Sequence, residues 1–177
     1  MKKQYKIAIV GPESTGKSSL SESLSNYFKT YFVPEVARDY LNNLRSNYEE
    51  SDLLVIAKKQ IEVEDLISSN VGDLLICDTT LLVIKIWSQV KYNHCNSWIL
   101  EEENRRKYDL FLLCDIDLEW GFDPLREHPD KRDFLFNLYY QSLLSSNATF
   151  EIISGKGNER VNNAITVINK HYPVKNS

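Results

Sequence analysis

Short apolar runs alternate with longer amphipathic stretches along the chain. Five runs rich in β-branched, aromatic and leucine residues predict strands, at Tyr5–Val10, Tyr31–Val33, Leu74–Cys77, Leu110–Cys114 and Thr149–Ile153. In the stretches between them, apolar side chains recur at helical spacing. Strands that alternate with helices in this way indicate an α/β fold whose sheet is mainly parallel.

Two of the helical stretches show which face they bury. The predicted buried face of the first consists of Leu20, Leu24, Tyr27 and Phe28, and that of the second of Leu53, Ile56, Gln60, Val63 and Ile67. A third stretch, Leu81–Val90, is hydrophobic enough to serve either as core or as an interface. The six glycines all lie outside the predicted helices and strands, so we expect each to mark a turn or a close approach of backbone.

Length and composition predict one ordinary domain. The chain has 177 residues, of which 42% are hydrophobic and 26% charged, so residues 1–177 can bury a core, and neither disorder nor a membrane protein is expected. The 21 basic and 25 acidic side chains give a net charge of -4, which argues against a protein that coats nucleic acid. No apolar run approaches the roughly 20 residues that span a bilayer. We therefore expect neither nucleic acid nor a membrane as a partner.

The start of the chain and its cysteines predict a cytoplasmic protein. The basic segment Met1–Lys6 leads into a short apolar strand rather than into a signal-peptide core. The three cysteines are odd in number and lack metal-ligand spacing. Cys77 and Cys114 each close an apolar run, which is typical of small buried hydrophobes in a reducing compartment. The adjacent pair His94-Cys95 is expected to lie in a loop and not to bind metal.

Residues 11–18 form a phosphate-binding motif. They match the pattern G-x-x-x-x-G-K-[ST], with a predicted strand directly before them and a predicted helix after Ser18. Glycines let backbone N–H groups turn toward a polyphosphate, and the helix N-terminus adds positive potential. We expect Lys17 to reach the β- and γ-phosphates as a catalytic residue, and the Ser18 hydroxyl to coordinate Mg²⁺. The residues expected to bind ATP here are Gly11, Glu13, Ser14, Thr15, Gly16, Lys17, Ser18 and Ser19.

A P-loop also needs an acid on a neighbouring strand to support the metal, and Asp78 fits this role. It follows Leu74–Cys77, at the edge where ligands bind to parallel sheets. We expect Asp78 to hold Mg²⁺ directly or through water. The competing role is an N-cap for the helix predicted to start near Thr80.

Other motifs separate the chain from the GTPase switches. Its single Asn-Lys pair, Asn169-Lys170, is followed by His171 and Tyr172 and does not complete the guanine-reading element N-K-x-D. Asp78 is followed by Thr79–Leu81, without the glycine of D-x-x-G. A small-molecule kinase instead needs an acid that handles the acceptor and a lid that carries arginine, and both are present.

The acid is Glu35, which follows the second predicted strand. A carboxylate in this place is positioned to accept the proton of an attacking hydroxyl or to bond a ribose. Its alternative role is structural, because an acid in the first turn of a helix interacts favourably with the helix dipole. Arg38 and Asp39 come next and would, in the alternative reading, form an exposed pair in that turn.

The lid is predicted at residues 119–133. Two prolines and a glycine prevent a continuous helix there, and Arg126 and Arg132 bracket the loop. The planar guanidinium of arginine bonds two phosphoryl oxygens at once, so we expect both arginines to neutralise charge in the transition state. Closure of the lid would also exclude water, which otherwise competes as nucleophile. The alternative is a solvated charged loop.

Together these motifs resemble the family of ribosylnicotinamide kinase domains found in NadR and in its stand-alone relatives. The similar segments are 11–18, 34–40, Ile56-Ala57 with Gln60, Cys77–Thr80 with Lys85, Trp87 and Lys91, and Trp120 with Asp123–Arg126 and Arg132. The resemblance implies transfer of the ATP γ-phosphate to the 5′-hydroxyl of nicotinamide riboside, with Mg²⁺ as cofactor. The product would be nicotinamide mononucleotide, a step of NAD salvage. We expect a three-layer P-loop NTPase fold of the nucleoside and nucleotide kinase type, with a parallel five-stranded sheet in the order 2-3-1-4-5.

The resemblance also implies roles for individual residues. Glu35 and Arg38 would handle the ribose or the incoming hydroxyl. Trp120 would lie near the nicotinamide ring, where an aromatic face suits a cationic pyridinium, or would serve only to anchor the lid. Gly155 and Lys156 follow the fifth predicted strand, where P-loop kinases commonly pass backbone along the adenine.

Two departures from the family pattern change these expectations. Thr80 stands where family members often carry an acid, so the role of base rests on Glu35, with Asp78 as the alternative. The chain also begins at the P-loop strand and lacks the patterns H-x-x-H and H-x-G-H, so we expect neither the adenylyl transfer nor the DNA binding of multifunctional NadR proteins. Two competing functions stay open: a kinase for another nucleoside or nucleotide, and a regulatory ATPase without a small-molecule acceptor. GTP in place of ATP, and a homo-oligomer, also agree with the sequence.

Overall fold

The computed structural model describes residues 4–128 and 130–172, so Met1 to Lys3 of the basic start and Pro129 of the predicted lid lie outside the described residues. Five strands form one sheet in the order β2-β3-β1-β4-β5, and each pairs with its neighbours in parallel. They are β1 (Tyr5–Val10), β2 (Phe32–Val33), β3 (Leu74–Asp78), β4 (Leu110–Cys114) and β5 (Phe150–Ile153). The predicted order and direction are confirmed. The predicted bounds are off by one residue in three strands, and Asp78 is the last residue of β3.

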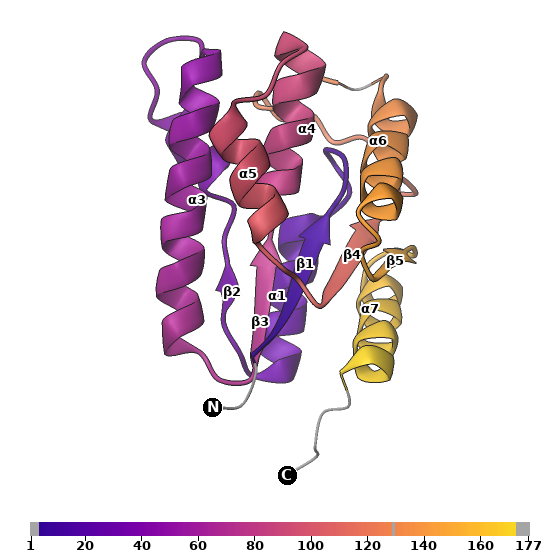
Figure 1. Ribbon diagram of the computed structural model, residues 1–177. Helices are drawn as coiled ribbons and strands as arrows, with labels where there is room; N and C mark the ends of the chain where they lie inside the picture. The colour runs from indigo at the N-terminus through magenta and orange to yellow at the C-terminus, as the bar shows by residue number, and fades with distance from the viewer. Residues whose placement is uncertain (1–3, 129, 173–177) are drawn as a thin grey trace.

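Helices cover both faces of the sheet, which makes three layers (Figure 1). They are α1 (Lys17–Phe28), α2 (Val36–Asn42), α3 (Glu50–Asn70), α4 (Leu81–Tyr92), α5 (Ser97–Arg105), α6 (Arg132–Ser145) and α7 (Asn158–His171). Helices α1 and α7 pack on one face of the sheet. Helices α3, α4 and α6 pack on the other face, and α2 and α5 pack against α3 and α4.

The central strand β1 shows how the sheet holds the two helical layers. Successive side chains of a strand point to opposite faces. Ile7 and Ile9 therefore lie in the cluster with α1 and α7, whereas Ala8 and Val10 lie in the cluster with α4 and α6. All four side chains are fully buried. A strand buried on both faces reads as a continuous apolar run, which is why its position was evident in the sequence.

The two helix faces predicted from spacing are mostly confirmed. In α1, Leu20 and Leu24 are buried and Phe28 packs against the same cluster. Tyr27 was wrongly placed on this face, because its side chain is 57% exposed. Tyr27 lies beside the buried face that Leu20, Leu24 and Phe28 form at spacings of four residues, and its ring packs edge-on against Phe28. In α3, Leu53, Ile56 and Gln60 are buried, and Val63 and Ile67 pack under β2 and β3.

The hydrophobic stretch that begins at Leu81 is a core helix. In α4, Leu81, Leu82, Ile84 and Ile86 are all buried between the sheet and neighbouring helices. Cys77 and Cys114 are buried free thiols inside the sheet, as predicted. Among the described helices, none is both long and apolar enough to cross a membrane.

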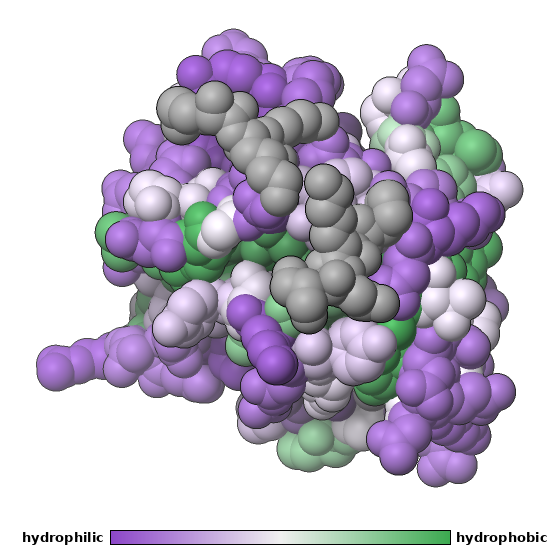
Figure 2. Space-filling view, turned by 90° about the horizontal axis from the view of Figure 1, so that it is seen from below, coloured by the Kyte–Doolittle hydropathy of each residue, from purple (hydrophilic) through white to green (hydrophobic). Residues whose placement is uncertain are grey.

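The two edges of the sheet differ in character. Figure 2 views the molecule from the side of the amino ends of the strands, where hydrophilic side chains predominate. The opposite edge collects the carboxyl ends of all five parallel strands (Figure 1). Ligands of such sheets bind outside the carboxyl ends.

Candidate active site

The phosphate-binding motif forms the turn between β1 and α1. Gly11 lies directly against β4, and a Cβ built on it would stand 2.9 Å from the backbone oxygen of Cys114. Its φ of +141° is also a conformation that side chains rarely adopt. At the other end of the turn, Gly16 has φ +74° and caps α1. Both positions therefore require glycine because their φ angles are positive, and Gly11 requires it also because a Cβ would collide with the backbone of Cys114.

Inside the turn, side chains hold the loop in a curled shape. The Thr15 hydroxyl is buried and donates to the carbonyl oxygen of Pro12 at 2.8 Å. Lys17 Nζ donates to the carbonyl oxygens of Gly11 at 3.0 Å and of Pro12 at 2.8 Å. The ammonium group is thus held across the mouth of the loop, at the N-terminus of α1, where positive potential accumulates. This arrangement can bind a polyphosphate.

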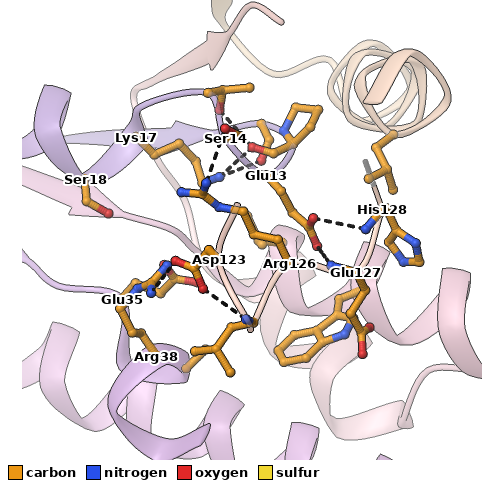
Figure 3. A pocket seen from close by; sticks show the side chains of 18 of the residues that line it. Glu13, Ser14, Lys17, Ser18, Glu35, Arg38, Asp123, Arg126, Glu127 and His128 are labelled. Carbon is orange, nitrogen blue, oxygen red and sulfur yellow. Dashed lines mark hydrogen bonds and ion pairs between the residues drawn. The ribbon is translucent and has the colours of Figure 1, made fainter. Parts of the chain in front are cut away.

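A cavity of about 420 Å³ opens beside this loop. That volume lies in the range of about 300–1,000 Å³ that is usual for small-molecule sites. Figure 3 shows the labelled side chains converging on the cavity from the phosphate loop, from the segment around α2 and from the predicted lid. Its polar wall includes Gly11–Ser19, Glu35, Arg38, Asp123, Arg126, Glu127 and His128, and its apolar wall includes Leu41, Val83, Ile86, Trp87, Val90 and Leu125.

Asp78 lies deep beside the loop, with only 1% of the residue exposed. Burial raises the pKa of its carboxyl to about 6, although a hydrogen bond with Ser18 and the charge of Lys17 lower it. Burial dominates because the charged form loses its hydration. The predicted alternative, an N-cap of the next helix, is wrong, because Thr80 occupies the N-cap position of α4, although its side chain makes no capping hydrogen bond.

Mg²⁺ fits this corner of the molecule. Among the buried side chains of the described residues, Asp78 Oδ1 and the hydroxyls of Thr79 and Thr80 have no hydrogen-bond partner. Unpaired buried oxygens cost free energy, so a group that binds them stabilises the site. Carboxylate, hydroxyl and water oxygens are the ligands that Mg²⁺ prefers. The Ser18 hydroxyl and the Asp78 carboxyl, which interact with each other, are therefore a chemically suitable Mg²⁺ site.

Glu35 occupies the N-cap position of α2 without a capping hydrogen bond from its side chain, and a buried glutamine holds the segment that carries it. Gln60 of α3 is 1% exposed, accepts the backbone N–H of Val36 at 2.9 Å and donates to the carbonyl of Pro34 at 3.0 Å. These two bonds bracket Glu35 on both sides. Gln60, the polar residue on the otherwise apolar buried face of α3, therefore positions the segment that carries the cavity's carboxylate.

Arg38 contacts the predicted lid. Its guanidinium donates to Asp123 Oδ2 at 2.8 Å. A bond from the Leu125 backbone and this arginine both keep the pKa of Asp123 below its usual range. Arg38 and Asp39 are both exposed in the first turn of α2, as the alternative predicted, but Arg38 also pairs with Asp123 and lines the cavity.

The predicted lid is docked on the phosphate loop (Figure 3). Glu13 accepts the backbone N–H groups of Glu127 at 3.1 Å and of His128 at 3.2 Å. The Ser14 hydroxyl accepts the N–H of Gly121 at 2.9 Å, and Arg126 also contacts this hydroxyl. The negatively charged Glu13 carboxylate of the phosphate loop therefore accepts hydrogen bonds from backbone N–H groups of the lid.

Other predicted site residues are not brought to the cavity. Arg132 does not line the cavity, but it donates to the carbonyl oxygens of Leu118 at 2.8 Å, of Ile116 at 3.2 Å and of Ser14 in the phosphate loop at 3.4 Å, so it joins the base of the lid to that loop. Trp120 stands beside Arg126, 5.9 Å from the guanidinium carbon to the ring centroid, and is absent from the wall of the cavity. The tryptophan in that wall is Trp87.

The loop after β5 lies at the same sheet edge but outside the cavity. The Gly155 N–H donates to Asp117 Oδ2 at 2.6 Å, and Arg160 donates to the Gly155 carbonyl at 2.9 Å. Lys156 follows in this loop. Neither Gly155 nor Lys156 lines the cavity, so their predicted role along the adenine stays a prediction.

Sequence reasoning missed Trp87 and Glu127 as parts of the cavity wall. Trp87 belongs to an apolar helix, and its spacing does not tell which ring faces a cavity. Glu127 is one acid in a strongly charged loop, and only the folded lid brings it to the cavity. Their positions in the chain could have indicated a place in the cavity wall. Trp87 is one of the motif residues that carry the family resemblance, and Glu127 directly follows Arg126.

The sequence matches known proteins over most of its length. A family model described as an AAA domain matches residues 6–160. The trifunctional NAD biosynthesis/regulator protein NadR of Escherichia coli (strain K12) is 26% identical over 151 residues, which are 81% of this chain and 37% of that protein. The chain thus spans little more than a third of the length of this relative.

Solved structures share the fold. The crystal structure of NadR protein in complex with NR has a TM-score of 0.77 and 17% identity, and the match covers 97% of this chain and 52% of the other. Thymidylate kinase from Ehrlichia chaffeensis has a TM-score of 0.64 and 14% identity, over 94% of this chain and 99% of the other. The expected P-loop fold of the nucleoside and nucleotide kinase type is confirmed.

Proposed function

The chain belongs to the AAA domain family, whose model matches residues 6–160, and we propose that it is an ATP-dependent kinase for nicotinamide riboside. It transfers the γ-phosphate of ATP to the 5′-hydroxyl of the riboside and releases nicotinamide mononucleotide. The observation that carries the proposal is a cavity whose wall combines Lys17, Glu35 and Arg126. The likeness to NadR, a protein named for NAD biosynthesis, supports nicotinamide riboside as the acceptor.

The phosphate loop and Lys17 bind the triphosphate of ATP. Backbone N–H groups of the loop and the N-terminus of α1 face the phosphate oxygens, and Lys17 exchanges its carbonyl partners for the β- and γ-phosphates. Ser18 and Asp78 would hold Mg²⁺, which would neutralise phosphate charge. Arg126 reaches the transferring group from the lid.

The acceptor enters between α2 and α4. Glu35 accepts the proton of the attacking hydroxyl, because it lines the cavity and Gln60 holds its backbone in place. Trp87 takes the role first predicted for Trp120, since an aromatic face attracts a cationic pyridinium ring. Most of the rate arises from positioning and electrostatics, because phosphoryl transfer asks for little covalent help from the protein.

We also propose that residues 1–177 act as one kinase domain in the cytoplasm, with residues 119–133 as its lid. Lid residues already bond the phosphate loop through Glu13 and Ser14. Closure over ATP keeps water away from the γ-phosphate.

A second candidate function is a kinase for another nucleoside or nucleotide. The fold shared with thymidylate kinase supports this alternative, since that match covers 99% of the kinase chain. The two candidates use the same phosphate chemistry and differ only in the acceptor.

The test is an acceptor panel with purified protein, ATP and Mg²⁺. ADP release and phosphorylated product are measured with nicotinamide riboside, adenosine, thymidine, deoxyadenosine, AMP and dTMP, and with no acceptor. We expect nicotinamide riboside to give the largest stimulation and nicotinamide mononucleotide as product. A larger stimulation by another acceptor would support the second candidate. ADP release that no acceptor changes would instead support a regulatory ATPase.

The test variant is Lys17→Ala, which removes the lysine of the phosphate loop, and its matched control is Lys107→Ala. Lys107 is exposed just before β4, at the opposite edge of the sheet. Lys17→Ala should abolish the stimulation, and Lys107→Ala should retain it.

A further inference from the structure

One lid residue, Glu127, is held from two sides. Its carboxylate accepts Lys91 Nζ of α4 at 2.8 Å and the hydroxyl of Tyr48, which precedes α3, at 2.7 Å. Its backbone N–H donates to Glu13 of the phosphate loop at 3.1 Å. A single residue of the lid thus joins the phosphate loop to the helices on the acceptor side of the cavity.

The acceptor-side contacts form a connected cluster. Lys91 Nζ lies 3.6 Å from the centroid of the Tyr48 ring, which favours a cation–π interaction as well as the ion pair. The indole N–H of Trp87 donates to the Tyr48 hydroxyl at 2.8 Å. Tyr48 therefore links the cavity-lining ring of Trp87 to the lid carboxylate.

The cluster stands directly next to the lid arginine. Arg126 precedes Glu127 in the chain and lines the cavity. The lid backbone around Arg126 is fixed to the phosphate loop by the bonds of Glu127 and His128 to Glu13 and by the bond of Gly121 to Ser14. The carboxylate of Glu127 adds contacts that fix the same segment to the acceptor wall.

We propose that Glu127 is a positioning residue that couples the acceptor wall, through Tyr48 and Trp87, to the placement of Arg126 over the phosphate loop. The inference rests on the proposed kinase function and deepens it. An acceptor that contacts Trp87 stabilises the cluster, and the cluster holds the lid in the position in which Arg126 faces the transferring phosphate. Without these contacts the lid opens more often, water enters, and ATP is hydrolysed without transfer to the acceptor.

The test compares Glu127→Gln, Tyr48→Phe and their combination with a matched control, Glu103→Gln. Glu103 of α5 pairs with Lys85, which like Lys91 belongs to α4, at 3.2 Å. The pair Lys91–Glu127 is 30% and 34% exposed, and the control pair is 22% and 20% exposed. The control thus removes an ion pair of similar burial from the same helix.

Two measurements report on coupling. The first is kinetic: kcat, the KM values for ATP and acceptor, and the ratio of ADP released to acceptor phosphorylated. We expect kcat to fall about fivefold in each single variant, which corresponds to about 1 kcal/mol for a partly exposed charged contact. The ADP ratio should rise, KM for ATP should stay within about twofold, and the double variant should resemble the worse single variant because both act on one cluster. The second measurement is hydrogen exchange of residues 121–128 with a non-hydrolysable ATP analogue bound, which should be faster in Glu127→Gln than in Glu103→Gln.

Failure of the proposed function and failure of this inference are distinguishable. If the wild-type protein phosphorylates no acceptor, the proposed function fails, and the exchange measurement alone decides the role of Glu127. Equal exchange of residues 121–128 in Glu127→Gln and Glu103→Gln overturns the inference. So does a fall in kcat without any rise in the ADP ratio, because a merely structural loss lowers both products together.

Discussion

Replacement of Asp78 by asparagine should stabilise the metal-free protein at neutral pH. Burial raises the pKa of this carboxyl from 3.8 in the unfolded chain to about 6 in the folded protein. The folded state therefore binds the proton more tightly, and ionisation of Asp78 destabilises the fold. Because a tenfold change in an equilibrium constant corresponds to about 1.4 kcal/mol, the effect is about 3 kcal/mol.

The upward direction of the pKa shift determines the pH range in which Asp78 changes the stability of the fold. The contribution of the protonated carboxyl to the free energy of unfolding is complete below about pH 4. It is lost as the pH rises toward 6, and the loss is then constant. The amide of the variant carries no charge at any of these pH values. Asp78→Asn should therefore be more stable than the wild type above pH 6 by up to about 3 kcal/mol, less what the bond with Ser18 contributes.

The assay is urea unfolding without Mg²⁺ between pH 4 and 7.5, for wild type, Asp78→Asn and a control, Glu22→Gln. Glu22 is an exposed acid in α1, so its replacement should leave the pH profile close to that of the wild type. Other acids titrate in the same range, and the difference between wild type and Asp78→Asn isolates the one carboxyl. A difference that does not change between pH 4 and 7 would refute the reasoning. Added Mg²⁺ and ATP should reverse the order, because the ligands stabilise the wild type and the variant lacks a ligand for the metal.

Three further predictions concern the loop and its neighbours. Lys17→Ala should lower kcat/KM for ATP by about 10²–10³-fold in steady-state kinetics, since it removes a charged donor from the transition state, and a loss below tenfold would contradict its assignment. Gly11→Ala should lower the free energy of unfolding in urea by about 1–3 kcal/mol, because the new Cβ meets the Cys114 oxygen at 2.9 Å. Unchanged stability would contradict this contact, since it would mean that β4 moves away without cost. Gln60→Met keeps the side-chain volume but removes both bonds that bracket Glu35, so kcat should fall while KM for ATP stays the same. A rise in KM for ATP by the same factor as the fall in kcat would argue against a role of Gln60 that is confined to Glu35.

The local sequence was sufficient for the parts of the site that one turn of chain builds. The motif at residues 11–18 is a strand, a glycine turn and a helix start in direct succession, so its shape follows from nearest neighbours. Gly11 and Gly16 occupy conformations that the pattern alone predicts. Asp78 was predictable for a similar reason, because it ends a fully apolar strand, and such strands end at the ligand-binding edge.

Contacts between distant segments were beyond a single sequence. Trp87 and Trp120 are both tryptophans near polar motif residues, and only the packing of α4 against α2, α3 and α5 turns Trp87 toward the cavity. Arg132 was predicted to act on the phosphates; in the structure its guanidinium donates to backbone oxygens at the base of the lid and to the Ser14 carbonyl of the phosphate loop, so its catalytic role stays a prediction. The direction of a long flexible side chain depends on which acceptors the rest of the fold brings within reach.

The order of hydrophobic and polar residues by itself determined the strands, their parallel arrangement and the position of the phosphate loop. These features follow from interactions between residues close in the chain and from the burial of β1 and β3 on both faces. Tertiary structure alone decided that Gln60 holds Glu35, that Glu13 holds the lid and that Glu127 meets Tyr48 and Lys91. Each of these contacts joins segments at least 24 residues apart, and their geometry is set by the packing of whole helices rather than by local spacing.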